Sequence, residues 1–151
     1  MLYLDCRMLE GSGISTYLSN LIQQFRSNHS KIQLNYLVKS YSNLISQAPD
    51  YPGQHLFQSK IYSINEQFYF PKKYDKNDLL HIPHYNAPLT FPGKLIVTVH
   101  DLCHLVMKEY FKGPAKRFYA TIFLGMVLKK ASRIITVSHF TESEILKHFN
   151  V

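Results

Sequence analysis

Residues 95–101 read LIVTVHD, and this stretch decides the fold. The first five of these residues form a run without polar alternation, which is typical of a central parallel strand covered on both faces. The run ends at His100 and Asp101, so two polar side chains directly follow the predicted strand. A similar run at residues 133–138 (RIITVS) predicts another buried strand, which ends at Ser138.

The N-terminal segment predicts a strand, a glycine loop and a helix. Residues 1–4 are apolar and stop at an aspartate, and residues 11–13 (GSG) then form a loop. From residue 14 to residue 25, apolar residues recur at spacings of three and one, which indicates one face of an amphipathic helix. Ser12 is placed to cap this helix and Asn28 to end it.

The rest of the chain alternates between strand and helix patterns. Further strands are predicted at residues 32–38, 55–61 and 79–82. Helical segments are predicted at residues 41–48, at 64–74 (ending at Pro71), at 114–131 (opened by Pro114) and from a capping box at 141–144. This alternation predicts a doubly wound α/β domain with a mostly parallel sheet, as a single domain over residues 1–151.

Composition limits the class of protein. Hydrophobic residues make up 46% of the 151 residues, which excludes intrinsic disorder. No apolar run reaches the roughly 20 residues of a membrane span, and no signal peptide opens the chain. Cys6 and Cys103 stand in apolar surroundings without metal-ligand spacing, so we expect a reduced, cytosolic protein. The net charge of +7 suits an anionic partner, whether nucleic acid, lipid or a phosphorylated small molecule.

Polar residues follow several predicted strands. In doubly wound sheets ligands bind beyond the carboxyl ends of the strands, so we expect Asp5 to Arg7 with the glycine loop, His100 with Asp101, and Ser138 to converge. The loop lets backbone N–H groups approach an anion at a helix start, although by itself the pattern is more often an ordinary tight turn. It is neither a dinucleotide fingerprint nor a P-loop.

Histidines gather in two of these segments. His81 and His84 flank a proline at a strand end, and Asp101 can fix the tautomer of His100 or act as a base. One alternative is therefore a metal-dependent hydrolase that uses His81, His84, His100, Asp101 and His104. The spacings of these residues match no common metal site.

The predicted helix at residues 114–131 is both basic and aromatic. Its lysines, arginine and aromatic residues suit anionic lipid headgroups or an acidic acceptor, or else the aromatics pack in the core and the lysines are solvated. A second alternative is therefore a non-catalytic basic module for nucleic acid or membrane. The sequence lacks an RNA- or DNA-binding signature, which argues against nucleic acid.

Four segments in this order resemble the N-terminal half of family-4 glycosyltransferases of the GT-B fold. They are residues 5–9 (DCRML) with 12–14 (SGI) and Tyr17, then 81–86 (HIPHYN), 97–102 (VTVHDL) and 131–140 (ASRIITVSHF). The resemblance covers essentially the whole chain, and it is closest to bacterial mannosyltransferase-like members that build polysaccharides and lipid-linked glycans. It implies two Rossmann-like domains across a cleft, with residues 1–151 as the acceptor-side domain and the C-terminal donor-binding domain absent from this chain.

The resemblance also implies an activity and its site. Such enzymes transfer a hexosyl group from a nucleotide sugar to a glycan or lipid-linked acceptor with retention, without a metal or other cofactor. The implied partners include an anionic membrane contacted peripherally at its inner, cytoplasmic face, and no nucleic acid. The implied roles are donor-diphosphate contact for Gly11, Ser12 and Gly13, sugar contact for His100 supported by Asp101, and acceptor or cleft contact for Arg7, Tyr17, His84 and Ser138.

The chain departs from the family pattern in two places. Residues 15–17 read STY where many relatives have Gly-Arg-Tyr, so the loop is expected to be stiffer and to lack a cation. The chain stops at Val151, without counterparts of the family's donor-binding basic residue and paired glutamates. We therefore expect the isolated chain to fold but to transfer no sugar.

Overall fold

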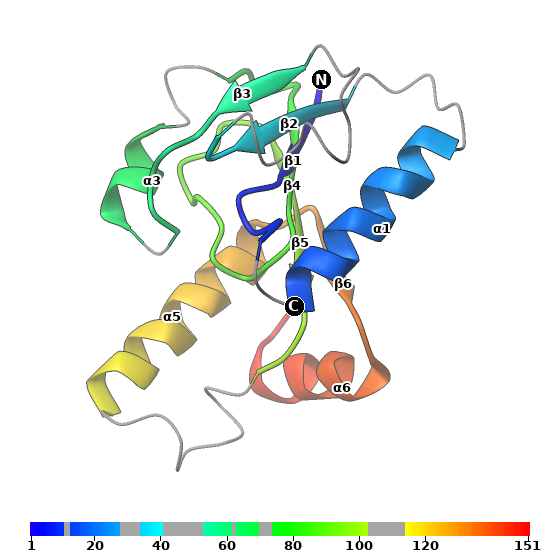
Figure 1. Cartoon of the computed structure of the whole chain (residues 1–151). Coiled ribbons are helices and arrows are strands. Elements are labelled where there is room, and N and C mark those ends of the chain that lie inside the picture. Colours follow the sequence, from blue (N-terminus) through cyan, green and yellow to red (C-terminus); the bar gives the residue numbers. More distant parts are fainter. Residues whose placement is uncertain (11–12, 28–33, 41–52, 62, 70–73, 103–113) are drawn as a thin grey trace.

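The computed structural model describes residues 1–10, 13–27, 34–40, 53–61, 63–69, 74–102 and 114–151. Six parallel strands form one sheet in the order β3-β2-β1-β4-β5-β6 (Figure 1). The strands are β1 (Leu2–Asp5), β2 (Leu34–Val38), β3 (Gln54–Leu56), β4 (Leu79–Ile82), β5 (Lys94–Val99) and β6 (Arg133–Thr136). The described helices are α1 (Gly13–Ser27), α3 (Ile64–Tyr69), α5 (Pro114–Lys130) and α6 (His139–His148).

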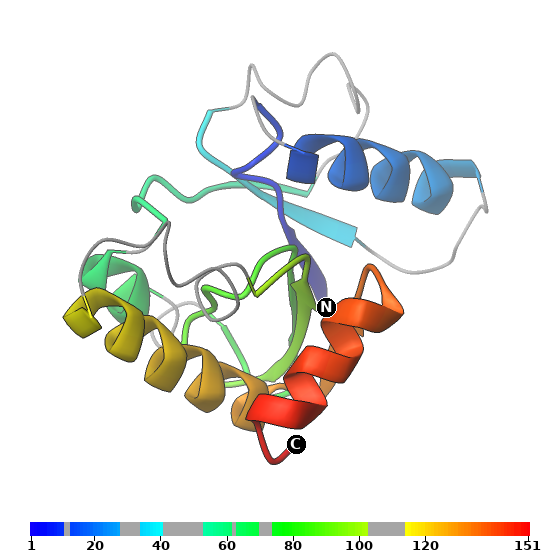
Figure 2. The same ribbon diagram turned by 90° about the horizontal axis from the view of Figure 1, so that it is seen from below.

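The predicted α/β class is confirmed. The sheet is all parallel, and its order reverses between β1 and β4, as in Rossmann-like folds, where a ligand crevice forms at such a reversal. The two halves of the sheet are wound in opposite directions, so α1 covers one face while α5 covers the other (Figure 2). The predicted turn at residues 41–48, the cap at Ser12 and the helix ends at Asn28 and Pro71 lie outside the described residues.

The core divides into two apolar clusters, one on each face of the sheet. Leu18 and Ile22 of α1 pack against β1 and β2 in the smaller cluster. The larger cluster joins the apolar residues of β5 to the inner face of α5. In β5 the predicted two-sided burial is confirmed, because Leu95, Val97 and Thr98 are all fully buried.

The prediction that residues 133–138 form a buried strand is wrong about burial. β6 is a strand, but it lies at the end of the sheet and pairs only with β5 among the described strands. Ile134 packs toward α6 on one face, while Ile135 and Val137 stay exposed. The sequence carries the apolar composition of an inner strand, but composition does not say which strand stands last in the order.

The predicted capping box at residues 141–144 is displaced. α6 begins at His139, and its N-cap is Ser138, whose hydroxyl oxygen accepts a hydrogen bond from the Thr141 N–H at 3.1 Å. Thr141 lies in the first turn, where its hydroxyl donates to the His100 carbonyl at 3.1 Å. The cap therefore comes directly after β6, and it ties the start of α6 to the end of β5.

Candidate active site

The ends of β5 and β6 and the start of α1 meet at one edge of the sheet. Tyr17, one helical turn after Gly13, hydrogen-bonds through its hydroxyl with Thr98 Oγ1 at 3.1 Å. Its ring meets the His100 ring edge to face, with centroids 5.3 Å apart and planes at 88°. With the bond from Thr141 to the His100 carbonyl, these contacts bring three segments that are distant in the sequence to one place.

The Pro83 carbonyl sets the tautomer of the His100 ring. Its Nε2 lies 3.0 Å from the Pro83 carbonyl oxygen. A carbonyl oxygen only accepts, so Nε2 carries the proton, and in the neutral ring Nδ1 is left as an acceptor. His100 is half-buried, whereas the adjacent Asp101 is exposed. The hydrogen bond of the His100 ring that the structure shows is therefore made to a backbone carbonyl just after β4.

A buried chain of neutral polar groups stands behind this edge. Thr98 Oγ1 lies 2.9 Å from His81 Nε2 as well as next to the Tyr17 hydroxyl. Burial lowers the pKa of His81 to about 4, although the charge of Asp5 acts in the opposite direction. His81 is therefore neutral near pH 7. One threonine hydroxyl thus links a strand histidine to the tyrosine of α1 and fixes the position of both.

A second, charged cluster fills the neighbouring side of the same edge. The Arg7 guanidinium donates from Nε to Asp5 at 2.9 Å and from Nη2 to both Asp5, at 2.6 Å, and Glu66 of α3. Its Nη1 donates to the Ser59 carbonyl at 3.0 Å, and the group lies 3.9 Å from the centroid of the Phe57 ring. All three charged side chains are fully or almost fully buried. The cluster is closed to solvent.

Burial and ion pairing act against each other in this cluster. Burial alone would raise the pKa of Asp5, but the Arg7 guanidinium holds it well below its usual range. Burial would likewise lower the pKa of Arg7, and the two carboxylates raise it instead. For Glu66 burial prevails over the attraction of Arg7, and the pKa is raised. Glu66 is therefore the most readily protonated member of the pair of carboxylates.

Two residues after β4 extend the charged cluster. The Asn86 side-chain amide donates to Glu66 Oε2 at 2.9 Å, and the Asn86 backbone N–H donates to His84 Nδ1 at 3.1 Å. Since His84 Nδ1 accepts, the proton of the neutral ring is on Nε2, which lies 3.8 Å from Asp5 Oδ2. The loop after β4 is thus tied to both β1 and α3.

The structure places the predicted site residues in two groups. Gly13, Tyr17, His100, Asp101 and Ser138 lie at the open part of the sheet edge, and each is exposed or half-buried. Arg7 and His84, which the resemblance places at the acceptor or the cleft, are instead buried in the charged cluster. Gly11 and Ser12 lie outside the described residues.

Three residues of the site were given no role by the sequence analysis, although Asn86 and Thr98 lie within the segments that resemble the family. Glu66 and Asn86 complete the charged cluster, and Thr98 joins the neutral groups. Glu66 is separated from Arg7 by 59 positions and lies in an aromatic segment without a motif. The one feature of the sequence that points to Glu66 is that it is the only acidic residue in the segment 64–74.

The metal-site alternative is not favoured by the geometry. His81 bonds with Thr98 and His100 bonds with Pro83, while His84 accepts from Asn86, so the three rings serve separate partners. Across the described ranges, no three residues of the types His, Cys, Asp and Glu are grouped as metal ligands. Cys103 and His104 lie outside those ranges.

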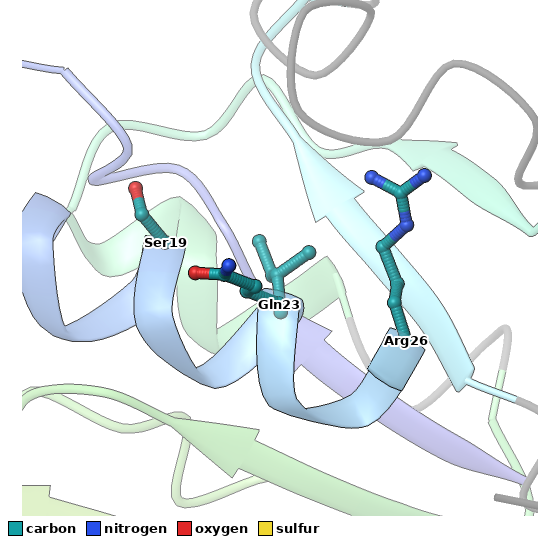
Figure 3. Close-up of a pocket in the computed structure, with 4 residues that line it drawn as sticks. Ser19, Gln23 and Arg26 are labelled. Carbon is teal, nitrogen blue, oxygen red and sulfur yellow. The ribbon is translucent and has the colours of Figure 1, made fainter. Parts of the chain in front are cut away.

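Two surface hollows lie apart from this edge. One, of about 320 Å³, runs along the middle and end of α1 beside Ser19, Ile22, Gln23 and Arg26 (Figure 3). The other, of about 190 Å³, lies between β6 and α6 and is lined mainly by apolar residues. Neither is lined by Tyr17, Thr98 or His100. They are therefore not the strand-end site.

Comparison with known proteins gives one family. Residues 11–151 match the model of Glycosyltransferase Family 4. No curated protein and no solved structure matches the chain. The matched region contains the start of α1, the ends of β4 and β5 and all of α6. In the described part of the chain, no helix has the length and apolar character needed to cross a membrane.

Proposed function

Since the chain belongs to glycosyltransferase family 4, we propose that it forms the acceptor-side half of a sugar-transferring enzyme of the GT-B type. The proposed reaction moves a hexosyl group from a nucleotide sugar to a glycan or lipid-linked acceptor and retains the anomeric configuration. The structural observation that carries the proposal is the contact of Tyr17 with His100 and Thr98, which joins the start of α1 to the end of β5.

Departure of the nucleotide leaves negative charge on a diphosphate oxygen. The first turn of a helix offers N–H groups without intrahelical partners, and the positive end of the helix dipole favours an anion there. We assign this role to Gly13 and the start of α1. Preorganised donors of this kind stabilise developing charge without having to reorient during the reaction. An added Cβ at Gly13 would meet no atom of the described residues within 4 Å, which leaves room for a ligand beside this backbone.

His100 is proposed to hold the transferred sugar. With its Nε2–H engaged by the Pro83 carbonyl, its Nδ1 is available to accept a hydrogen bond from a sugar hydroxyl. Tyr17 packs against the ring and fixes its orientation. Asp101 and Ser138 are proposed to line the cleft beside it. Arg7 and His84 act as positioning residues in this proposal, because their side chains are buried.

The proposal also covers the second domain, the metal requirement and the cellular location of the enzyme. The donor-binding half is proposed to be a separate domain. The 151 residues of this chain would then form one side of the cleft and would not transfer sugar without that domain. The reaction is proposed to need no metal, and transfer should persist in EDTA. The enzyme is proposed to work in the cytoplasm, at the inner face of the membrane when its acceptor is lipid-linked.

Substitution of His100 tests the proposal in the complete enzyme. His100→Ala should lower kcat strongly while the far-ultraviolet circular dichroism and the unfolding midpoint stay near those of the wild type. His100→Gln keeps a donor for the Pro83 carbonyl but loses the Nδ1 acceptor, so it should lower kcat to a similar degree. An unchanged kcat in both variants would remove His100 from the chemistry.

A further inference from the structure

A mostly buried segment without regular secondary structure lies between the charged cluster and His100. Residues 83–90 follow β4 and belong to no helix or strand, yet most of them are buried. Loops normally run over the surface, because buried backbone groups need hydrogen-bond partners that an irregular segment does not supply by itself. Contacts with other elements must therefore hold this segment in place.

Helix α3 supplies several of these contacts through two neighbouring residues. Glu66 Oε2 accepts a hydrogen bond from the Asn86 side chain at 2.9 Å. Gln67 Oε1 accepts one from the Leu89 backbone N–H at 2.7 Å, and the Thr90 hydroxyl donates to the Gln67 carbonyl. One short helix thus holds the segment both at its middle and at its end.

Glu66 is itself fixed on its other side. Its Oε1 accepts a hydrogen bond from the Arg7 guanidinium, which also donates to Asp5. The side chain of Glu66 is fully buried, so bulk solvent does not reach either carboxylate oxygen. Hydrogen bonds between charged groups are about twice as strong as those between neutral ones. Glu66 therefore joins residues 83–90 to a rigid anchor.

The first residue of the segment touches His100. The Pro83 carbonyl accepts a hydrogen bond from His100 Nε2 at 3.0 Å. Between Pro83 and Asn86 the chain is closed by the His84 ring, whose Nδ1 accepts from the Asn86 backbone N–H at 3.1 Å. The proline ring also fixes its own φ angle. The residue that Glu66 holds and the carbonyl that orients His100 therefore belong to one tight, buried turn.

We propose that Glu66 is a positioning residue for His100. It holds Asn86, and through the turn after β4 it fixes the Pro83 carbonyl, which keeps the proton of the neutral His100 ring on Nε2 and leaves Nδ1 as an acceptor. The contact of Nδ1 with a sugar rests on the proposed function, whereas the link from Glu66 to the His100 ring does not. The two are therefore tested separately.

Exchange of the His100 Nε2–H proton with solvent, measured by nuclear magnetic resonance on the ¹⁵N-labelled chain, tests the link. Glu66→Ala should speed this exchange about ten-fold, the factor that corresponds to the loss of one hydrogen bond. Glu66→Gln keeps an acceptor for Arg7 and an amide partner for Asn86, and it leaves Arg7 and Asp5 as a balanced pair. The glutamine variant should therefore exchange as the wild type does.

A matched control separates positioning from a general loss of stability. Val127 of α5 is fully buried close to the turn that bonds to Leu95, at the start of β5 and away from His100. Val127→Ala should lower the unfolding midpoint and leave the exchange of the His100 proton unchanged. If Glu66→Ala does not fold, Asn86→Ala breaks the same link from the loop side and should speed the exchange to the same degree.

Activity of the complete enzyme provides the second readout. Glu66→Ala should lower kcat about ten-fold or more with little change in the donor KM, because a displaced sugar contact weakens the transition state, and Glu66→Gln should restore it. Faster exchange with an unchanged kcat would support the link and remove His100 from the chemistry of transfer.

Three outcomes would overturn the positioning role of Glu66. One is unchanged exchange of the His100 proton in a folded Glu66→Ala or Asn86→Ala variant. Another is exchange in Glu66→Gln that is as fast as in Glu66→Ala. The third is an equal acceleration in Val127→Ala, which would trace the effect to stability alone.

Discussion

Two polar clusters lie side by side at the carboxyl edge of the sheet, and they differ in charge and in access. The cluster of Asp5, Arg7 and Glu66 is ionic and buried, and every group in it bonds to another part of the protein. The cluster of Tyr17, Thr98, His81 and His100 consists of hydroxyls and imidazoles and opens to solvent at His100. The ionic cluster therefore fixes the backbone after β1, and the neutral one forms the part of the edge that is open to solvent.

The largest effect is expected from breaking the ionic cluster. Arg7→Met leaves two buried carboxylates without a counter-charge, and loss of one partner of a buried ion pair costs about 3–5 kcal/mol. The free energy of unfolding in urea measures this change. Arg133→Met, on an exposed arginine of β6, should alter it by no more than about 0.5 kcal/mol. Equal effects of the two substitutions would mean that the ionic cluster does not stabilise the fold.

The neutral cluster should make the stability of the fold depend on pH, because it contains the buried His81. The pKa of His81 falls from 6.5 to about 4 on folding, so the folded protein binds fewer protons than the unfolded chain between these values. The neutral His81 therefore contributes fully to the free energy of unfolding above pH 6.5. This contribution is lost as the pH falls to about 4, and the total loss is about 3 kcal/mol. His81→Gln should remove this part of the pH dependence.

The matched control is His139, a fully exposed histidine on α6. His139→Gln is the control for the substitution itself, because it removes an imidazole from the surface and not from the neutral cluster. A wild type whose stability stays level over that range would contradict the neutral, buried state of His81.

A smaller effect is expected at the hydroxyl that joins the neutral cluster. Thr98→Val keeps the shape of the side chain but leaves His81 and the Tyr17 hydroxyl without this partner, at about 1–3 kcal/mol. Tyr17→Phe removes only one of the two bonds and should cost about 1 kcal/mol. If Tyr17→Phe lowers the free energy of unfolding more than Thr98→Val does, Thr98 is not the link between His81 and Tyr17.

The smallest effect on stability is expected at Gly13, where the effect on ligand binding should be large. Within the part of the chain that the structure describes, an added methyl group meets no atom within 4 Å, so Gly13→Ala should leave the fold unchanged or stabilise it by up to about 1 kcal/mol. In the complete enzyme the same methyl group occupies the proposed approach to the diphosphate and should raise the donor KM. An unchanged donor KM would mean that the diphosphate does not bind at the start of α1.

The order of elements was predictable because each strand and helix leaves a local pattern. The unbroken run of β5, the spacing of apolar residues in α1 and Pro114 at the start of α5 all predict the observed elements. The meeting of Gly13, His100 and Ser138 at one edge follows from parallel strands, whose carboxyl ends share an edge. These predictions needed no knowledge of contacts between distant residues.

The parts that were not predictable depend on such contacts. Glu66 becomes the partner of Arg7 only when the fold brings α3 to the residues after β1, and no spacing rule connects positions 59 apart. Residues 133–137 have the composition of an inner strand, yet their burial depends on the strand order. Thr141 has the sequence of an N-cap, but Ser138, already at the end of β6, takes that place.

The free side of β6 has a practical consequence for handling the protein. Among the described strands β6 has a neighbour on one side only; it carries exposed Ile135, and exposed Val137 follows its last residue. A row of unpaired backbone groups beside apolar side chains is a template for pairing with another chain. Concentrated samples of this chain should therefore aggregate through β6, and a lysine in place of Ile135 should slow that aggregation.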